Sequence, residues 1–361
     1  MIQQLLDQKV KSYPRISVVI VNWNRRDMLV ECLQSLANQT LPPFEVIVVD
    51  NGSTDGSVEA ARKCLELRVC VICNTANKGF CEANNQGFAA ATGDLFALLN
   101  NDAVADPRWL EELAEAFTDA SDVGMAASKI LVYDQRDKID KVGHLIYWDG
   151  QNRGRGTGEQ DHGQYDKVEE VLWPDGCAAM YRREMIEEIG GFDEEFFAYA
   201  DDAELGLRGR LAGWRAIYRP GARVFHRRGS TLGVYSSNRI QLIERNRILL
   251  VFKHFPWSLI WRNGWFYLGR MLAGATAAAR GKGEAGKVPG LLPKLRLLLA
   301  LLTGGLKSLP LIPSMLRKRR QFQPLRKLNN RQLMDLLRRY QIPLKELSEQ
   351  ANSSPSNPPT R

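Results

Sequence analysis

Polar side chains follow two apolar runs that are typical of buried strands. Asp50 ends the run EVIVVD, and Asn100, Asn101 and Asp102 follow the run LFALL. The carboxyl ends of neighbouring strands in an open α/β sheet converge on one ligand crevice, so these side chains are candidates for a single site. A carboxylate there can accept hydrogen bonds from a ribose or a nucleobase, and another can hold Mg²⁺ or Mn²⁺ opposite a diphosphate. The alternative for each aspartate is a turn or a helix cap without a ligand.

The densest acidic stretch, residues 192–214, also contains a group of aromatic side chains. Its first part carries the carboxylates of Glu194, Glu195, Asp201, Asp202 and Glu204. A carboxyl group held against apolar walls has a raised pKa and can serve as a general base. Acidic residues also favour the first turn of a helix, where they remain solvated. The local sequence is compatible with both interpretations.

His226 closes the apolar run ARVFH and is followed by two arginines. A lone histidine is more often structural than functional. This one stands at the end of a predicted strand beside cations that suit phosphate, which makes it a candidate ligand.

The pattern of the chain indicates an α/β fold that places these residues. Strands are predicted at 16–22, 45–50, 69–73 and 95–100, with helical patterns between them, the first from about Asp27. Such alternation predicts parallel strands with right-handed crossovers, and fully apolar strands predict a doubly wound sheet covered on both faces. Beyond residue 121 the pattern is mixed, with strands expected near 123–134, 170–182 and 216–226. The Gly-rich stretch 149–166 is predicted to be a functional or disordered loop.

The C-terminal part of the chain is basic and rich in leucine. Residues 280–339 hold fifteen Lys or Arg and two Asp or Glu, although the whole chain has a net charge of only +8. The longest uncharged run, 297–306, is about half of the roughly 20 residues that span a membrane. Interleaved leucines and cations, with Trp257, Trp261 and Trp265, favour a helix lying in an anionic membrane interface rather than a nucleic-acid site. The alternative is a helical hairpin packed on the body with solvated cations.

Cysteine usage and the N-terminus favour the cytoplasm. Six cysteines include one C-x-x-C, Cys70 and Cys73, but no second Cys or His pair follows at zinc-finger spacing. The first fifteen residues lack the apolar core and cleavage site of a signal peptide. We therefore expect a cytoplasmic protein, peripheral on the cytoplasmic face of the membrane.

Six segments of the chain, in this order, resemble glycosyltransferase family 2, in its rhamnosyltransferase-like branch. They are SVVIVNWNRRDMLVECLQSLANQT, EVIVVDNGSTDGS, NKGFCEANNQGFAAATGD, LLNNDA, IGGFDEEFFAYADDAELGLR and VFHRRGST. The resemblance covers residues 14–255 and implies the GT-A fold, a single α/β domain around a mainly parallel sheet. We expect this catalytic domain at 1–235, with a nucleotide-binding half at 14–120 and an acceptor-binding half at 121–235. A helical, basic extension at 236–345 and a disordered tail at 346–361 would follow.

The resemblance assigns roles on the donor side. Asn22 matches the strand end that lines the nucleotide pocket, and Asp50 matches the acid that recognises the base. Asn100, Asn101 and Asp102 match the D-x-D motif, in which the first residue faces the ribose and the last binds the metal. Asn100 departs from the usual aspartate, but an amide can still hydrogen-bond a ribose hydroxyl.

The resemblance also assigns the metal and acceptor sides. Asp202 matches the catalytic base, with Asp201 beside it in place of the usual glutamate. Gly176, in PDGCAAMY, matches the start of the acceptor-side strand. His226 matches a histidine that completes the metal site with Asp102, where Mg²⁺ or Mn²⁺ is expected.

Together these residues indicate an inverting glycosyltransferase. The donor would be a nucleotide-diphosphate sugar, with rhamnose favoured by the branch. The acceptor would be a hydroxyl of a glycan or a lipid-linked glycan in cell-surface polysaccharide synthesis. One alternative is a catalytically silent scaffold that binds sugar nucleotides. Another is a nucleotidyltransferase, but the segment NWNRRDML after the first strand has none of the glycines that a phosphate-binding loop requires.

Overall fold

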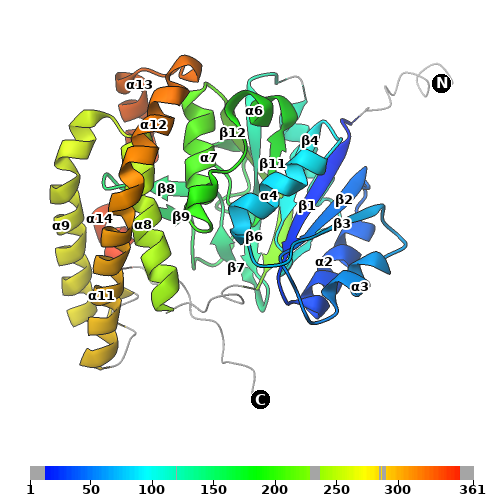
Figure 1. Ribbon diagram of the computed structural model, residues 1–361, viewed down its shortest axis with the longest axis horizontal. Coiled ribbons are helices and arrows are strands. Elements are labelled where there is room, and N and C mark those ends of the chain that lie inside the picture. The colour runs from blue at the N-terminus through cyan, green and yellow to red at the C-terminus, as the bar shows by residue number, and fades with distance from the viewer. Residues whose placement is uncertain (1–12, 119, 228–235, 284–285, 287–289, 350–361) are drawn as a thin grey trace.

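The N-terminal half of the sheet is parallel, with helices on both sides (Figure 1). The computed structural model describes residues 13–118, 120–227, 236–283, 286 and 290–349. The strands of this half are β1 (Ile16–Asn22), β2 (Glu45–Asp50), β3 (Val69–Cys73) and β4 (Leu95–Leu99), in the order β4-β1-β2-β3. They alternate with α2 (Arg26–Ala37), α3 (Ser57–Arg62) and α4 (Gly79–Ala90). The expected parallel strands are confirmed, because β1 pairs in parallel with β2 and with β4, and β2 pairs in parallel with β3.

The alternation of side chains along β1 shows how both faces of the sheet are covered. Val18 and Ile20 belong to one hydrophobic cluster and Val19 to the other, as the two-residue period of a strand requires. Leu29 and Leu33 of α2 cover the first face. The expectation of full burial is wrong for β3, whose side chains are partly or fully exposed, because β3 forms the edge of the sheet.

The second half of the sheet mixes parallel and antiparallel strands. Its strands are β5 (Ala103–Ala105), β6 (Val123–Val132), β7 (Gln135–Lys141), β10 (Glu169–Val171), β11 (Ala178–Arg182) and β12 (Arg215–His226). β11 lies antiparallel between β4 and β6, and β12 is parallel to β6. The helical segments here are α5 (Trp109–Ala114), η1 (Glu115–Phe117), α6 (Arg183–Ile189), η2 (Glu194–Phe196) and α7 (Asp201–Leu211). The fold is therefore the expected α/β type, with its parallel part at the predicted nucleotide side.

The Gly-rich stretch 149–166 is ordered. Part of it forms β9 (Asn152–Gly154), which pairs with β8 (His144–Ile146) in a separate two-stranded sheet. Asp161 and Asp166 lie 2.8 and 2.5 Å from the buried ammonium of Lys129. These ion pairs fasten the loop to β6, so its polar composition does not mean disorder.

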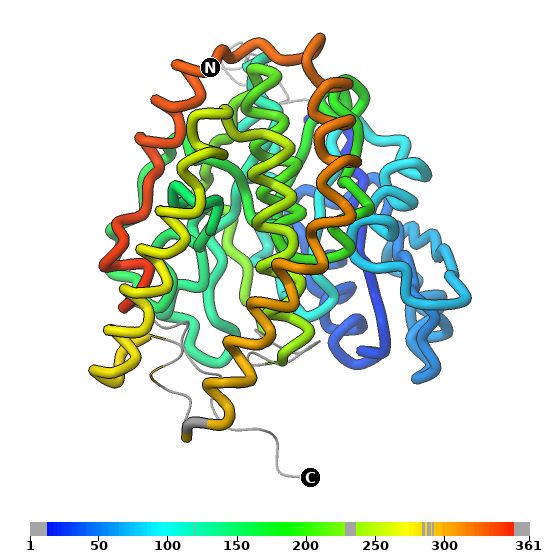
Figure 2. The backbone as a smooth tube through the Cα atoms, turned by 60° about the vertical axis from the view of Figure 1, so that its left-hand side comes forward, coloured from blue at the N-terminus to red at the C-terminus, as the bar shows by residue number. Residues whose placement is uncertain are grey.

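The C-terminal region is a set of helices beside the sheet (Figures 1 and 2). Its elements are α8 (Ser237–His254), α9 (Trp257–Ala279), α11 (Leu291–Ser308), η3 (Leu309–Leu311), α12 (Ile312–Phe322), η4 (Gln323–Leu325), α13 (Asn330–Arg339) and α14 (Leu344–Glu349). α11 and α12 pack against α8, and α14 packs against α9. α14 carries helical structure four residues into the predicted tail, and residues 350–361 lie outside the described part of the chain.

Candidate active site

A cavity of about 730 Å³ lies at the polar ends of the central strands and at the beginning of α7. It is lined by most of the residues singled out from the sequence, namely Asn100, Asn101, Asp102, Gly176, Asp201, Asp202 and His226. These residues come from four separate segments of the chain. The fold therefore brings the predicted donor, metal and acceptor residues to one cavity.

Asn22 and Asp50 are buried behind the wall of this cavity. Asn22 Nδ2 donates to Asp50 Oδ1 at 3.0 Å, and Asn101 Nδ2 donates to Asn22 Oδ1 at 2.7 Å. The backbone N–H and the hydroxyl of Ser53 also donate to the Asp50 carboxylate, at 2.8 and 2.6 Å. This chain of hydrogen bonds fixes Asn101 at the cavity wall. Asp50 itself is only 2% exposed and is not among the residues that line the cavity.

Strand pairing brings Asp102 and His226 together. His226 in β12 pairs with Ala103 in β5, so Asp102 is adjacent to the paired residue. His226 Nε2 lies 3.4 Å from Asp102 Oδ1, and its Nδ1 lies 2.8 Å from Asp140 Oδ2. Metal-ligating histidines commonly make such a hydrogen bond to a carboxylate with the second ring nitrogen, which fixes the ring. One carboxylate and one imidazole therefore fit Mn²⁺ or Mg²⁺, with oxygen ligands left to be supplied by a donor diphosphate.

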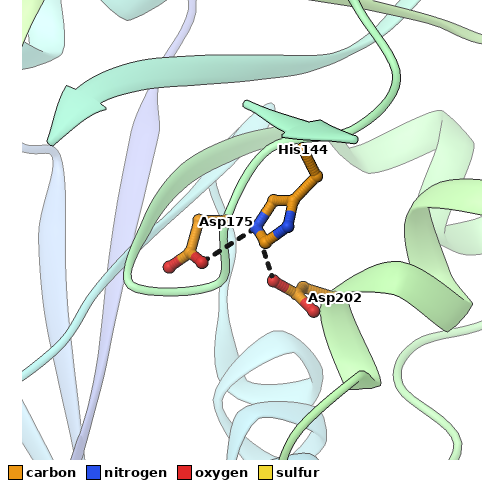
Figure 3. Close-up of side chains that lie close together, drawn as sticks. All are labelled: His144, Asp175 and Asp202. Carbon is orange, nitrogen blue, oxygen red and sulfur yellow. Dashed lines mark hydrogen bonds and ion pairs between the residues drawn. The ribbon is translucent and has the colours of Figure 1, made fainter. Parts of the chain in front are cut away.

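Asp202 meets a second histidine that the sequence did not single out (Figure 3). His144 Nε2 lies 3.3 Å from Asp202 Oδ2 and 2.9 Å from Asp175 Oδ2. The Asp202 carboxylate also accepts the backbone N–H groups of Ala203 at 2.8 Å and Gly176 at 3.4 Å. Asp202 is thus oriented by donors from β8, from the segment before β11 and from its own helix.

His144, Asp175 and Asp202 have the types and spacing of a possible metal site, since their ligand atoms lie within 4.8 Å of one another. Lys141 Nζ lies 2.5 Å from Asp175 Oδ2, however, and supplies a positive charge to the same carboxylate. A divalent cation would be repelled by this ammonium. The cluster is therefore better suited to holding Asp202 than to holding a metal.

The protonation states in this cluster differ between neighbours. Burial and the adjacent Asp202 carboxylate raise the pKa of Asp201 to about 8. Burial alone would lower the pKa of His144, but Asp202 and Asp175 raise it to about 9. At neutral pH Asp201 is then mainly a neutral acid and His144 a cation. The cation faces the side chain of Asp202 at 3.3 Å.

The segment before α7 is strained and held from two sides. Phe197, Tyr199 and Ala200 have positive φ, which residues other than glycine adopt at a cost of about 1–3 kcal/mol each. Asn246 on α8 donates to the carbonyls of Phe196, Ala198 and Tyr199 at 2.6–2.9 Å. Phe80 and Cys81, at the start of α4, donate to the Phe197 carbonyl. These bonds place Asp201 and Asp202 at the cavity despite the strain.

Sequence reasoning missed Asp140, His144, Asp175 and Asn246. Asp175 was within reach, because it precedes Gly176 in the same segment. Asp140 and His144 lie in a stretch without hydrophobic periodicity, and their roles depend on pairing with residues far along the chain. Asn246 lies on α8, where a helical pattern does not show that an amide faces a loop.

The parallel sheet, the carboxylates at its strand ends and the acidic start of α7 are features of the GT-A fold. The solved structure of a mannosyltransferase from Pyrobaculum calidifontis, in complex with GDP-Man and Mn²⁺, superposes with a TM-score of 0.51. It is 20% identical, and the match covers 92% of both chains, so this likeness supports the fold alone.

The family model of glycosyl transferase family 2 matches residues 17–190, so this part of the chain is similar to that family. The chain is 28% identical to an N-acetylglucosaminyl-diphospho-decaprenol L-rhamnosyltransferase from Mycobacterium tuberculosis over 269 residues, which cover 68% of this chain and 86% of that protein. It is also 28% identical to the O-antigen biosynthesis protein RfbC from Myxococcus xanthus over 62% of this chain. That match spans only 18% of RfbC. The chain is thus similar to rhamnosyltransferase-like relatives, as expected.

Proposed function

We propose that the protein is an inverting glycosyltransferase that moves a sugar, with rhamnose favoured, from a nucleotide-diphosphate sugar to a hydroxyl of a lipid-linked glycan in cell-surface polysaccharide synthesis. The observation that carries this proposal is the single cavity shared by Asp102, His226 and Asp202. Asp102 and His226 offer a carboxylate and an imidazole for a metal–diphosphate, and Asp202 offers a positioned base. The relative named N-acetylglucosaminyl-diphospho-decaprenol L-rhamnosyltransferase supports this class of donor and acceptor.

On the donor side, Asn100 and Asn101 line the cavity where a ribose would lie, with Asn22 and Asp50 behind them. Asp102 and His226 would hold Mg²⁺ or Mn²⁺. The bound ion would neutralise the diphosphate as charge develops on the leaving nucleotide.

On the acceptor side, Asp202 removes the proton of the acceptor hydroxyl as that oxygen attacks the anomeric carbon. The bond from the anomeric carbon to the donor diphosphate breaks, and the nucleoside diphosphate leaves. His144 and the Gly176 N–H keep the Asp202 carboxylate aimed at the cavity. Attack from the side opposite the leaving group inverts the anomeric configuration. Asp201 is mainly neutral, so it contacts the acceptor but does not compete with Asp202 for the proton of the acceptor hydroxyl.

Thermal stabilisation by sugar nucleotides tests the donor site. With Mn²⁺, one nucleotide family should stabilise the protein, by about 2.7 kcal/mol at roughly 100 times Kd. Asp102→Asn should remove most of this metal-dependent gain, because the amide lacks the charge that binds the cation. The exposed Asp134→Asn serves as the matched control and should behave as wild type. Equal metal-dependent stabilisation of wild type and Asp102→Asn would contradict the assignment.

The silent scaffold has no specific support in the structure. Such a protein has no need of a base, yet Asp202 is held by three donors beside the donor cavity. Release of nucleoside diphosphate by the wild-type protein separates the two functions, because a scaffold would bind the donor without releasing it.

We also propose that the protein is peripheral on the cytoplasmic face of the membrane, bound through α9 and α11. Within the described residues one helical segment, Leu292–Leu325, is long and apolar enough to cross a membrane, and 17% of its most apolar window is buried. Its second half is fastened to the body, since Lys318 Nζ lies 2.5 Å from Asp193 Oδ1 and Arg319 Nη1 donates to the Phe255 carbonyl at 2.5 Å. A segment held in this way fits the interface better than a span.

Sedimentation with vesicles tests this location. The full chain should pellet with anionic vesicles at low salt and less at high salt, because exposed cations are screened. Trp261 and Trp265 are 81% and 76% exposed, so replacing both with serine should weaken pelleting. If the full chain remains in the supernatant with anionic vesicles at low salt, the membrane proposal is wrong.

A further inference from the structure

The active-site cavity extends past the catalytic residues to the C-terminal helices. Besides Asp202 and Gly176, it is lined by apolar side chains of α8, α9, α11 and α14, namely Ile240, Ile243, Met271, Leu297, Leu301 and Leu347. A sugar nucleotide is mostly polar, so this number of aliphatic side chains is not needed to bind it. Charged side chains of α8 and α9 line the same part of the cavity, namely Arg239, Glu244, Arg247 and Arg270. Glu244 is paired with Arg247 at 2.6 Å and with Arg270 at 3.4 Å, so these charges neutralise one another beside the aliphatic side chains.

The part of the cavity lined by these aliphatic side chains is a groove whose walls are fixed. α11 lies close to α8 at Gly304, where an added Cβ would stand 2.6 Å from the carbonyl oxygen of Gln241, so only glycine permits this approach. α9 is fastened by Arg270, whose Nε lies 2.6 Å from Asp149 Oδ2 and whose Nη2 lies 3.4 Å from Glu244 Oε2 on α8. Figures 1 and 2 show α9 and α11 next to α8 on the C-terminal side of the molecule. The groove is thus a preformed feature of the fold.

The outer surfaces of the same helices are apolar and exposed. The exposed large side chains are Trp257, Trp261, Trp265, Leu268 and Leu272 on α9, and Leu292, Leu295, Leu298, Leu299, Leu302 and Leu306 on α11. Exposed apolar surface of this extent on two neighbouring helices is typical of a contact with a membrane or an apolar partner. A hydrocarbon chain leaving a bilayer would meet this surface next to the groove.

We infer that the groove between α9 and α11 binds the hydrocarbon chain of the acceptor lipid, while the glycan of the same molecule reaches Asp202. This inference rests on the proposed function, because it places the lipid-linked acceptor in the same cavity as the base. The observation that supports it is that one cavity is lined by Asp202 and also by Leu297 and Leu301. An amphiphile with a polar head and an apolar chain fits such a cavity along its whole length. The groove then selects acceptors by their chain and aligns the sugar hydroxyl with the base.

Binding of n-alkyl diphosphates to the full chain tests this inference without an identified acceptor. The titrations use chains from about four to about twelve carbons, below their micelle concentrations, with a chelator present so that the metal site does not bind the diphosphate. Burial of a methylene is worth roughly fourfold in affinity, so wild-type affinity should rise steeply with chain length. Inorganic diphosphate is the probe for the head group alone.

Two pairs of substitutions on one helix separate the groove from the outer surface. Leu297→Gln with Leu301→Gln places amides in the groove and should lower the affinity for the longest chain at least tenfold. Leu298→Gln with Leu302→Gln changes the neighbouring residues, which are 50% and 55% exposed, and should leave that affinity nearly unchanged. Should the first pair not fold, Met271→Gln on the opposite wall replaces it, with the same expected loss.

Several results would overturn the inference. Affinity that does not depend on chain length in the wild type would show that no hydrocarbon site exists. Equal losses in the two pairs would place the chain on the outer surface instead of in the groove. Thermal stabilisation by sugar nucleotide and Mn²⁺, measured on the same samples, reports the donor site separately. Its absence in the wild type would contradict the proposed function, whereas its presence with chain-independent diphosphate binding would contradict only the groove.

Discussion

Replacing Asp202 with asparagine is expected to lower turnover by about 10²–10⁴-fold, the usual contribution of a positioned base. The amide keeps the size of the side chain but cannot accept the proton of the acceptor hydroxyl. Donor binding should remain near wild type, because the donor side is formed by Asn100, Asn101 and Asp102. The measurement is the release of nucleoside diphosphate from the donor that stabilises the protein, with thermal stabilisation as the binding readout.

Asp201→Asn is the matched control, since it makes the same chemical change one residue earlier. Asp201, with a pKa raised to about 8, is mainly neutral at pH 7, and an amide resembles a neutral carboxyl group. Turnover should therefore stay within about tenfold of wild type, well above the range expected for loss of the base. An acid with a raised folded pKa loses stability as pH rises from about 4 to about 8, so this variant should gain in Tm over wild type across that range. If Asp201→Asn loses turnover while Asp202→Asn stays active, then Asp201 is the catalytic base and Asp202 is its neighbour.

The strand ends were predictable from sequence because their signals are local. β1, β2 and β3 begin and end at the predicted residues, since short apolar runs bounded by polar and turn residues leave little choice of structure. Asn100, Asn101 and Asp102 follow directly from the end of such a run. Their convergence with residues of the second half follows from the general rule that ligands bind beyond the carboxyl ends of parallel strands.

The partners of the candidate base and metal ligand were not predictable, because they depend on long-range pairing. Asp140 reaches His226 only because β7 and β12 both pair with β6, an arrangement that no local pattern encodes. His144 meets Asp202 across segments more than fifty residues apart. The difference in protonation between Asp201 and Asp202 is equally invisible in sequence, since it arises from burial and from the charges placed around each carboxylate.

The helix that carries Asp202 depends on a buried charge network centred on Glu204, two residues further along. Glu204 is fully buried, and its carboxylate lies 2.8 Å from Arg208 Nη2, 2.7 Å from Lys253 Nζ and 2.9 Å from His254 Nε2. Lys253 and His254 belong to α8, so the network ties α7 to the C-terminal helices. Burial alone would raise the pKa of Glu204, but Arg208 and Lys253 hold it well below its usual value of 4.5.

Glu204→Gln is expected to lower the free energy of unfolding by about 3–5 kcal/mol at pH 7, because it leaves buried cations without their shared counter-charge. A depressed folded pKa adds stability above pH 4.5, and this stability is lost as pH falls below that value. The difference in the free energy of unfolding between the variant and the wild type should therefore become smaller as the pH falls below 4.5. Denaturant unfolding at a series of pH values measures this difference. Glu187→Gln is the control, since its side chain is 63% exposed and lies 3.6 Å from Arg183, a surface pair worth about 0–1 kcal/mol. Two results would show that Glu204 does not anchor α7 through its charge. One is an equal loss of unfolding free energy in the two variants. The other is a difference between Glu204→Gln and wild type that does not change with pH.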